Sequence, residues 1–239
     1  MGASYAAEIN RELPMVRDAE LVRYINVLGD SIARIADTRG LEWHFSIVNS
    51  MDINAFAVPG GFIYLNRGLI DRAQTLSQVA GVIGHEIGHV TKRHSVKQMQ
   101  KAQGADIGVL GICVFTNMCG SQTGQAVIGL GANAAMASFS RADEDEADAA
   151  GITYMVRSGI DPTGIPEMFQ ILLDERKGTP DMVDSWFRSH PLEESRIAAG
   201  RARIAKLDPN SLVGLTRDSQ NFQAFKRRLA ALPVPPGGR

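Results

Sequence analysis

The chain lacks several features that would have suggested particular classes of protein. It has only two cysteines among 239 residues, and its formal net charge is −1. No run of basic residues offsets that balance, so we expect no nucleic-acid partner. No stretch reaches the length of a membrane-crossing helix without glycine or polar interruptions. The hydrophobic content of 44% and the charged content of 21% are instead typical of a globular protein.

The first residues also lack the marks of common targeting signals. The opening segment, MGASYAAEINRELP, becomes polar within ten residues and contains no apolar signal-peptide core. Met1-Gly2 would suit N-myristoylation, but that motif needs Ser or Thr at the position of Ala6. We therefore expect no signal sequence here, while a mature or truncated form of an exported protein stays open.

The two cysteines, Cys113 and Cys119, are separated by five residues. A disulfide between them would close a short loop and add modest stability, and the sequence alone leaves this pairing open. A thiolate metal site is disfavoured, because no neighbouring His or Cys completes it. The surrounding residues 104–139 are rich in Gly, Ala, Ser and Thr. This segment is interpreted either as a lid over an active site or as an ordinary helical hairpin.

Hydrophobic periodicity predicts a mainly helical chain with a short extended region. Residues 8–36 have the spacing of one or two amphipathic helices. Residues 43–66 are rich in strand formers and contain a Pro-Gly-Gly turn at positions 59–61. This pattern predicts a hairpin whose proline-bearing strand lies at a sheet edge. Further helices are predicted over residues 142–157, 163–174, 193–206 and 219–232.

A long helix is predicted to begin near Thr75 and to continue to about Gln103. Thr75 and Gln78 have the spacing of a capping box. The interior of this helix contains three glycines, Gly81, Gly84 and Gly88. Each glycine lowers helix propensity by roughly 1 kcal/mol relative to alanine, so we expect another element to approach closely here.

The same helix carries the sequence His85-Glu86-Ile87-Gly88-His89. Residues four apart share a helix face, so both imidazoles can reach one ion. Burying them with Glu86 and without partners would cost several kcal/mol, and a metal ion removes that cost. We predict one Zn²⁺ per chain bound by His85 and His89, with Glu86 as general base. The alternative is a polar cluster satisfied within the core.

A catalytic zinc needs a third protein ligand and an open position. Glu144 and Asp148 are four apart in SRADEDEADAAG and share a face of a predicted helix. Glu144 is the candidate third ligand, and Asp148 could accept the second ring N–H of a ligand histidine. Glu146 points elsewhere and is expected to be solvated. The alternative is that all three belong to an acidic, solvated helix face.

The motifs HEIGH and SRADEDEAD resemble those of the gluzincin metallopeptidases of family forty-eight. The segments NAFAVPGGFIYLNRGLI and RSHPLEESRI extend the resemblance over residues 5–230. It implies an α+β fold, a mostly helical zincin with a small sheet beside the zinc helix. It also points to the soluble periplasmic branch, without transmembrane helices or helical repeats. We expect one metallopeptidase domain over residues 1–232 and a disordered tail over residues 233–239.

Other residues have more than one interpretation. A tetrahedral oxyanion needs a stabiliser besides zinc, and His190 is the candidate; the resemblance implies that it can instead occupy the fourth zinc position at rest. A buried, loop-capping histidine is the third option. Arg196 could orient a carboxylate or substrate, or be an exposed helix residue. His44 and His94 are interpreted as surface residues.

Substrate binding is expected on an edge strand that contains Asn54, Ala55, Phe56 and Ala57. An extended peptide can pair with such a strand through main-chain hydrogen bonds, although ordinary strand pairing is the alternative. The leading function is zinc-dependent endopeptidase action on unfolded or misassembled exported polypeptides. The expected location is the bacterial periplasm or the exported side of a membrane, including peripheral association with a membrane or with the machinery that assembles membrane proteins. A chaperone-like module with a capped zinc site and a purely structural zinc site are the competing functions.

Overall fold

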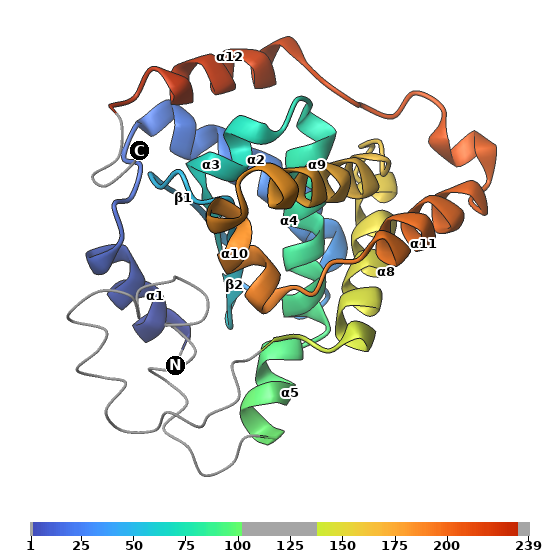
Figure 1. Ribbon diagram of the computed structural model, residues 1–239, viewed down its shortest axis with the longest axis horizontal. Coiled ribbons are helices and arrows are strands. Elements are labelled where there is room, and N and C mark those ends of the chain that lie inside the picture. The colour runs from blue at the N-terminus through green and yellow to red at the C-terminus, as the bar shows by residue number, and fades with distance from the viewer. Residues whose placement is uncertain (1, 102–137, 234–239) are drawn as a thin grey trace.

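The computed structural model describes residues 2–101 and 138–233 (Figure 1). In chain order the elements are α1 (Gly2–Glu12), α2 (Ala19–Ala36), β1 (His44–Val48), β2 (Ala55–Val58), β3 (Phe62–Asn66), α3 (Arg67–Arg72), α4 (Leu76–Thr91), α5 (His94–Lys101), α8 (Arg141–Arg157), α9 (Gly164–Gly178), α10 (Pro180–Ser189), α11 (Glu194–Ala205) and α12 (Gln220–Ala230). The prediction of a mostly helical α+β fold with a small sheet is confirmed.

The sheet has the strand order β1-β3-β2, so β2 is an edge strand. β3 pairs in parallel with β1 and antiparallel with β2. The turn between β2 and β3 places Gly60 and Gly61 at φ values of 105° and 97°, where residues with a Cβ are strained. The predicted hairpin at positions 59–61 and the edge position of the strand that leads into Pro59 are therefore confirmed.

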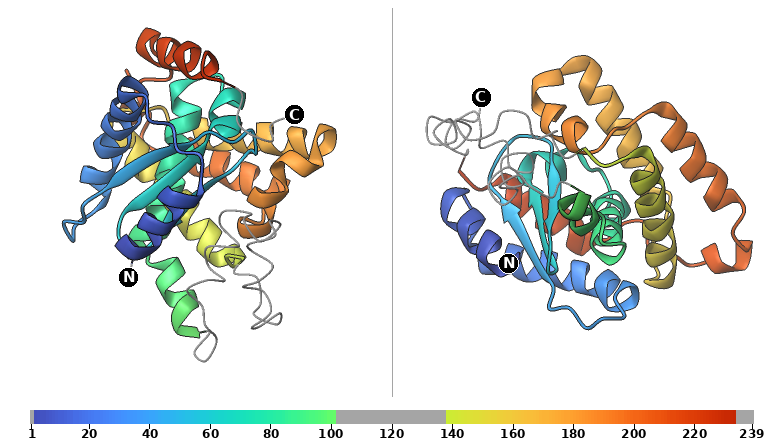
Figure 2. Two further views of the ribbon diagram at one scale, coloured as in Figure 1. Left: turned by 90° about the vertical axis from the view of Figure 1, so that its left-hand side faces the viewer. Right: turned by 90° about the horizontal axis from the view of Figure 1, so that it is seen from below.

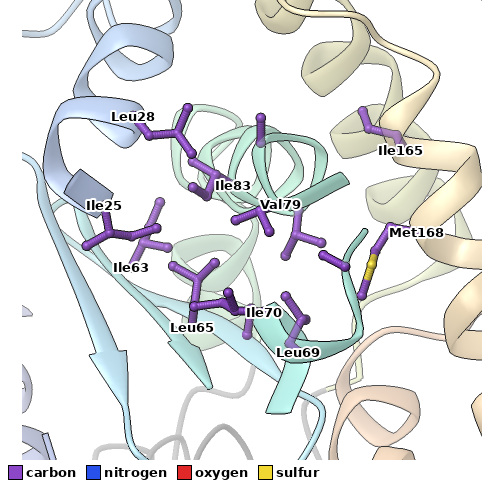
Figure 3. Packing of buried hydrophobic residues seen from close by; sticks show 14 of the residues in the cluster. Ile25, Leu28, Ile63, Leu65, Leu69, Ile70, Val79, Ile83, Ile165 and Met168 are labelled. Atoms are coloured by element: carbon purple, nitrogen blue, oxygen red, sulfur yellow. The ribbon is translucent and has the colours of Figure 1, made fainter. Parts of the chain in front are cut away.

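The two faces of the sheet pack against different helices (Figure 2). Alternate residues of β2 and β3 face α1 and form a small cluster that includes Ile9, Phe56 and Tyr64. The residues between them join the main core on the side of α2 and α4. In Figure 3, labelled side chains of that core from α2, β3, α3, α4 and α9 point toward one another.

Helix α4 runs through the middle of the molecule, between the sheet and helices α8 and α9 (Figure 1). Its glycines allow this close packing, as the sequence predicted. A Cβ on Gly88 would lie 2.9 Å from the carbonyl oxygen of Ala147 on α8. A Cβ on Gly81 would lie 2.9 Å from the backbone nitrogen of Ile165 on α9. The backbones that carry the candidate metal ligands are thus nearly in contact.

Two details predicted for α4 are wrong. The helix does not continue to Gln103, because Arg93 adopts a left-handed conformation with φ of 61° and ends it. The predicted capping box is also absent, since the Thr75 side chain makes no cap hydrogen bond. The Leu76 N–H instead donates to Asp218 Oδ1 at 3.1 Å. A residue far along the chain therefore caps the helix, which local spacing could not reveal.

The C-terminal half matches the predicted helices closely and adds one. Helix α8 begins with a capping box between Ser140 and Asp143, and Gly159 follows its end at φ of 74°. Helix α10 was not predicted, although its Trp186 is fully buried. It lies between the predicted segments and ends directly before His190.

Some predictions fall outside the described residues. These are the tail over residues 233–239, of which only Pro233 is described, and the pairing of Cys113 with Cys119. The lid interpretation of residues 104–139 is a third, because only the last two of those residues are described. The single domain over residues 1–232 stays a prediction. Among the described helices, none has both the length and the apolar character required to cross a membrane.

Candidate metal centre and active site

His85 and His89 lie one turn apart on α4, and both side chains are buried. Their Nε2 atoms are 3.0 Å apart. Glu144 on α8 faces both rings, with Oε1 3.3 Å from Nε2 of His89 and Oε2 3.7 Å from Nε2 of His85. The two histidines of α4 and the glutamate of α8 therefore place their ligand atoms next to one another.

His190 supplies a fourth donor from the residue that follows α10. Its Nδ1 is 3.1 Å from Oε1 of Glu144 and 3.3 Å from Nε2 of His85. The ring stacks on Trp186 with centroids 4.6 Å apart, which fixes its plane. The four ligand atoms all lie within 4.8 Å of one another.

The spacing of these atoms fits a metal ion. Ligand atoms about 2.0–2.1 Å from a tetrahedral zinc ion are about 3.3–3.4 Å from one another, and the separations given above bracket that value. Four such groups packed with their lone pairs converging would be unfavourable without a cation between them. Three imidazoles and one carboxylate are also a donor set that zinc accepts.

Asp148 and Arg196 form hydrogen bonds with the ligand residues on the side away from the converging atoms. Asp148 Oδ1 lies 2.8 Å from His85 Nδ1, so the carboxylate accepts that N–H and leaves Nε2 free to bind. Arg196 on α11 donates to both oxygens of Asp148, at 2.8 and 2.9 Å, and also to Glu144. Asp148 is thus in contact with His85, and its role in fixing the tautomer of that ligand stays a prediction. The alternative of an exposed Arg196 is wrong, because only 10% of its side chain is exposed, and its orienting role stays a prediction.

Glu86 lies next to the cluster and is 1% exposed. Its Oε1 has no hydrogen-bond partner among the described residues, and neither does His190 Nε2; these two atoms are 3.5 Å apart. Burial raises the pKa of Glu86. A buried carboxylate with one oxygen unpaired beside a metal site is suited to accept a proton from water.

The electrostatics of the ligands favour cation binding. Burial alone would raise the pKa of Glu144, but His190, His89 and His85 outweigh it and hold that pKa well below its usual range. Burial is the main cause that keeps the pKa of His89 well below its usual value. A carboxylate that stays ionised and an imidazole that stays neutral are the protonation states that a metal requires.

Sequence reasoning placed His94 on the surface, and this was wrong. His94 is fully buried, with Nδ1 3.0 Å from His89 Nδ1 and Nε2 3.1 Å from Glu146 Oε2. Glu146 is 44% exposed, as expected, yet it pairs with His94 and Lys92. His44 lies apart from the site, partly exposed and stacked on Phe62.

The proposed substrate strand lies at the edge of the sheet. Asn54 precedes β2, and Ala55, Phe56 and Ala57 belong to it. All four residues are buried. The side chains of Ala55 and Ala57 belong to the main core, and that of Phe56 belongs to the small cluster on the side of α1. Main-chain pairing along the outer edge of β2 therefore stays a prediction.

A His-Glu-x-x-His helix beside a small sheet, with a glutamate from a second helix, defines the zincin class of metallopeptidases. Comparison with known proteins agrees with this class. The model of peptidase family M48 matches residues 18–204, and the chain belongs to that family. The resemblance stated from the motifs is thus confirmed.

Several relatives carry protease names. The chain is 34% identical to the "Beta-barrel assembly-enhancing protease" of Yersinia pestis, over 97% of this chain and 48% of the relative. The protein of that name from Escherichia coli K12 is 33% identical, over 95% of this chain and 47% of the relative. "Metalloprotease LoiP" of E. coli K12 is 30% identical, over 77% of this chain and 69% of the relative. The chain spans about half the length of the first two.

Proposed function

We propose that the protein is a zinc-dependent endopeptidase in which His85, His89 and Glu144 hold one Zn²⁺ and Glu86 is the general base. The observation that carries this proposal is the convergence of four buried ligand atoms beside Glu86, whose Oε1 has no hydrogen-bond partner among the described residues. The family supports peptidase chemistry. A purely structural metal site is disfavoured, because it would leave a buried glutamate at position 86 without a role.

In this mechanism the bound zinc would act as a Lewis acid toward the scissile carbonyl. Glu86 takes a proton from the attacking water and delivers it to the leaving amine. Its raised pKa suits both steps, since the carboxyl can hold a proton between them. Asp148 keeps His85 in one tautomer, and Arg196 keeps Asp148 and Glu144 in place.

His190 is proposed to act in two ways. With Nδ1 among the ligand atoms, it can close the fourth position at rest. When its segment moves away to admit substrate, its ring N–H can donate to the oxyanion. Pro191 restricts the backbone directly after His190. The movement would therefore involve the whole segment around His190 rather than its side chain alone.

The substrates are proposed to be unfolded or misassembled exported polypeptides that bind along Asn54, Ala55, Phe56 and Ala57. Recognition through the main chain of β2 would depend little on sequence. The names of the relatives, which describe proteases that enhance β-barrel assembly, support a role in such assembly. We propose a periplasmic location or peripheral association with the exported side of a membrane. A chaperone-like module with a capped zinc site is the second candidate, favoured by the position of His190 Nδ1.

The test combines metal content with hydrolysis. We expect about one zinc per chain in the wild type, loss of most zinc in His89→Ala, and digestion of unfolded casein that a chelator stops. Equal zinc in both proteins would refute the ligand assignment. Zinc binding without casein digestion, together with suppression of casein aggregation, would favour the chaperone-like module.

A further inference from the structure

His94 has no part in the mechanism above, yet it is fully buried against a proposed metal ligand. Its ring touches His89 edge-on, with centroids 5.0 Å apart and planes at 76°. The ring of Phe139 stacks on a face of His89 at a centroid distance of 3.9 Å and lies 6.2 Å from the ring of His94. His89 is therefore held by a hydrogen-bonding ring at one edge and an apolar ring on one face.

The contact depends on the break between α4 and α5. Five residues along a continuous α-helix correspond to a rotation of about 140°, which would direct His94 away from His89. Arg93, at φ of 61°, turns the chain instead and brings His94 back toward the end of α4. A left-handed residue other than glycine is costly, so its presence next to the metal helix indicates a local requirement.

The hydrogen-bond partners determine which ring nitrogens carry protons. A neutral imidazole has one N–H and one lone pair. Glu146 Oε2 lies 3.1 Å from His94 Nε2, and an ionised carboxylate only accepts, so the His94 proton lies on Nε2. His94 Nδ1 is then an acceptor, and His89 Nδ1, 3.0 Å away, must be the donor. The lone pair of His89 is thereby left on Nε2, the atom that faces Glu144 and His85.

We propose that His94 is a positioning residue that sets the tautomer and ring orientation of His89 for metal binding, with Glu146 fixing the tautomer of His94. This inference rests on the proposed role of His89 as a zinc ligand. Under this proposal, the Nδ1–H groups of the two ligand histidines donate to different kinds of acceptor. Asp148 accepts directly from His85 Nδ1, whereas the carboxylate behind His89 acts through a second imidazole.

Two substitutions of His94 separate this role from simple packing. His94→Phe keeps a ring of similar size but offers no acceptor, so the N–H of His89 is left buried and unpaired. His94→Asn loses the ring but places a carboxamide oxygen on Cγ, where Nδ1 is attached in histidine. We expect zinc to bind 10–100-fold more weakly to His94→Phe, the usual effect of losing such a partner, and most of that loss to be restored in His94→Asn.

The measurement is the zinc dissociation constant by competition with a chromogenic chelator, without any activity assay. A packing role predicts the reverse order, with His94→Phe close to wild type and His94→Asn weaker, and that result would overturn the proposal. Thermal unfolding of the zinc-free proteins shows whether each variant folds. A wild type that binds no zinc would refute the proposed function itself, which distinguishes the two failures.

A second pair of variants does not disturb the buried ring. Glu146→Ala removes the nearer of the two carboxylates that face His94 Nε2, from a side chain that is 44% exposed. The other, Asp143 Oδ1, stays 3.6 Å from that nitrogen. Asp145→Ala is the matched control, because it removes the same charge from α8, and Asp145 pairs with Arg203 rather than with His94. We expect Glu146→Ala to weaken zinc binding several-fold relative to Asp145→Ala. Equal zinc affinity in these two variants would overturn the part of the proposal that assigns the tautomer of His94 to Glu146.

Discussion

The Nε2 atom of His190 faces Oε1 of Glu86 at 3.5 Å, and neither atom has a hydrogen-bond partner among the described residues. The other ring nitrogen of His190 lies 3.1 Å from Glu144. One imidazole thus lies between the proposed general base and a proposed metal ligand. Burial opposes protonation of this ring, but Glu144 and Glu86 outweigh it and raise the pKa of His190.

Replacing His190 tests both of its proposed roles. If it only closed the fourth ligand position, His190→Ala would raise activity. If it only stabilised the oxyanion, the variant would lose about 10²–10³-fold in turnover. We expect a mixed outcome in steady-state kinetics on a fluorogenic peptide, with a lower KM and a strongly reduced kcat. His44→Ala is the control, because His44 is partly exposed and outside the site. A His190→Ala enzyme with wild-type KM and kcat would leave only a structural role.

Glu86→Gln separates the base from the ligands. The amide has nearly the same shape but cannot accept the proton of water, so zinc content and fold should be retained while turnover is lost. The general base contributes about 10²–10⁴-fold in such reactions, and we expect a loss in that range. Elemental analysis and casein digestion of the same preparation check it. Near-wild-type digestion would exclude Glu86 as the base.

Arg196 should contribute far more to stability than its neighbour Arg203 on the same helix. Arg196→Met would leave Asp148 and Glu144 as buried charges without their partner, which costs about 3–5 kcal/mol. Arg203→Met removes a surface pair with Asp145 and should cost no more than about 1 kcal/mol. Urea unfolding in the presence of chelator measures both. Similar free energies of unfolding for the two variants would show that the buried ion pairs of Arg196 with Asp148 and Glu144 do not stabilise the fold.

The part of the site that could be predicted is the part set by local helix geometry. His85 and His89, or Glu144 and Asp148, share a face because they are four residues apart, and any helix there would bring each pair together. The hairpin at positions 59–61 could also be predicted, because the Pro-Gly-Gly sequence itself favours a turn. The need to satisfy buried polar groups then required the two helices to meet.

The rest depends on contacts that no local pattern encodes. Asp218 caps α4 from the opposite end of the chain, and Arg196 is buried because α11 packs on α8 and α9. His94 was misplaced because the predicted continuous helix directed it away from His89. The turn at Arg93 reverses that orientation, and arginine carries no sequence signal for a left-handed conformation.

Tyr64 connects α1 to the sheet, and its ionisation should lower the free energy of unfolding as the pH rises into the alkaline range. The side chain is 1% exposed, and its hydroxyl lies 3.2 Å from Asn10 Oδ1. Burial raises its pKa from 10.0 to about 12. A pKa that is higher in the folded state contributes stability that is fully present below the unfolded pKa near 10. That contribution is lost as the pH rises toward the folded value.

We therefore expect the wild type to lose about 2–3 kcal/mol of unfolding free energy between about pH 10 and pH 12 through this group, since one pKa unit corresponds to about 1.4 kcal/mol. Tyr64→Phe cannot ionise and should lose less over the same interval. Below about pH 9.5 the difference between the two proteins should be constant, and it should narrow above that pH. Urea titrations at half-unit pH steps, with tyrosinate absorbance followed in parallel, measure both quantities. A difference that stays constant up to pH 11.5 would show that Tyr64 ionises as readily in the folded protein as in the unfolded chain.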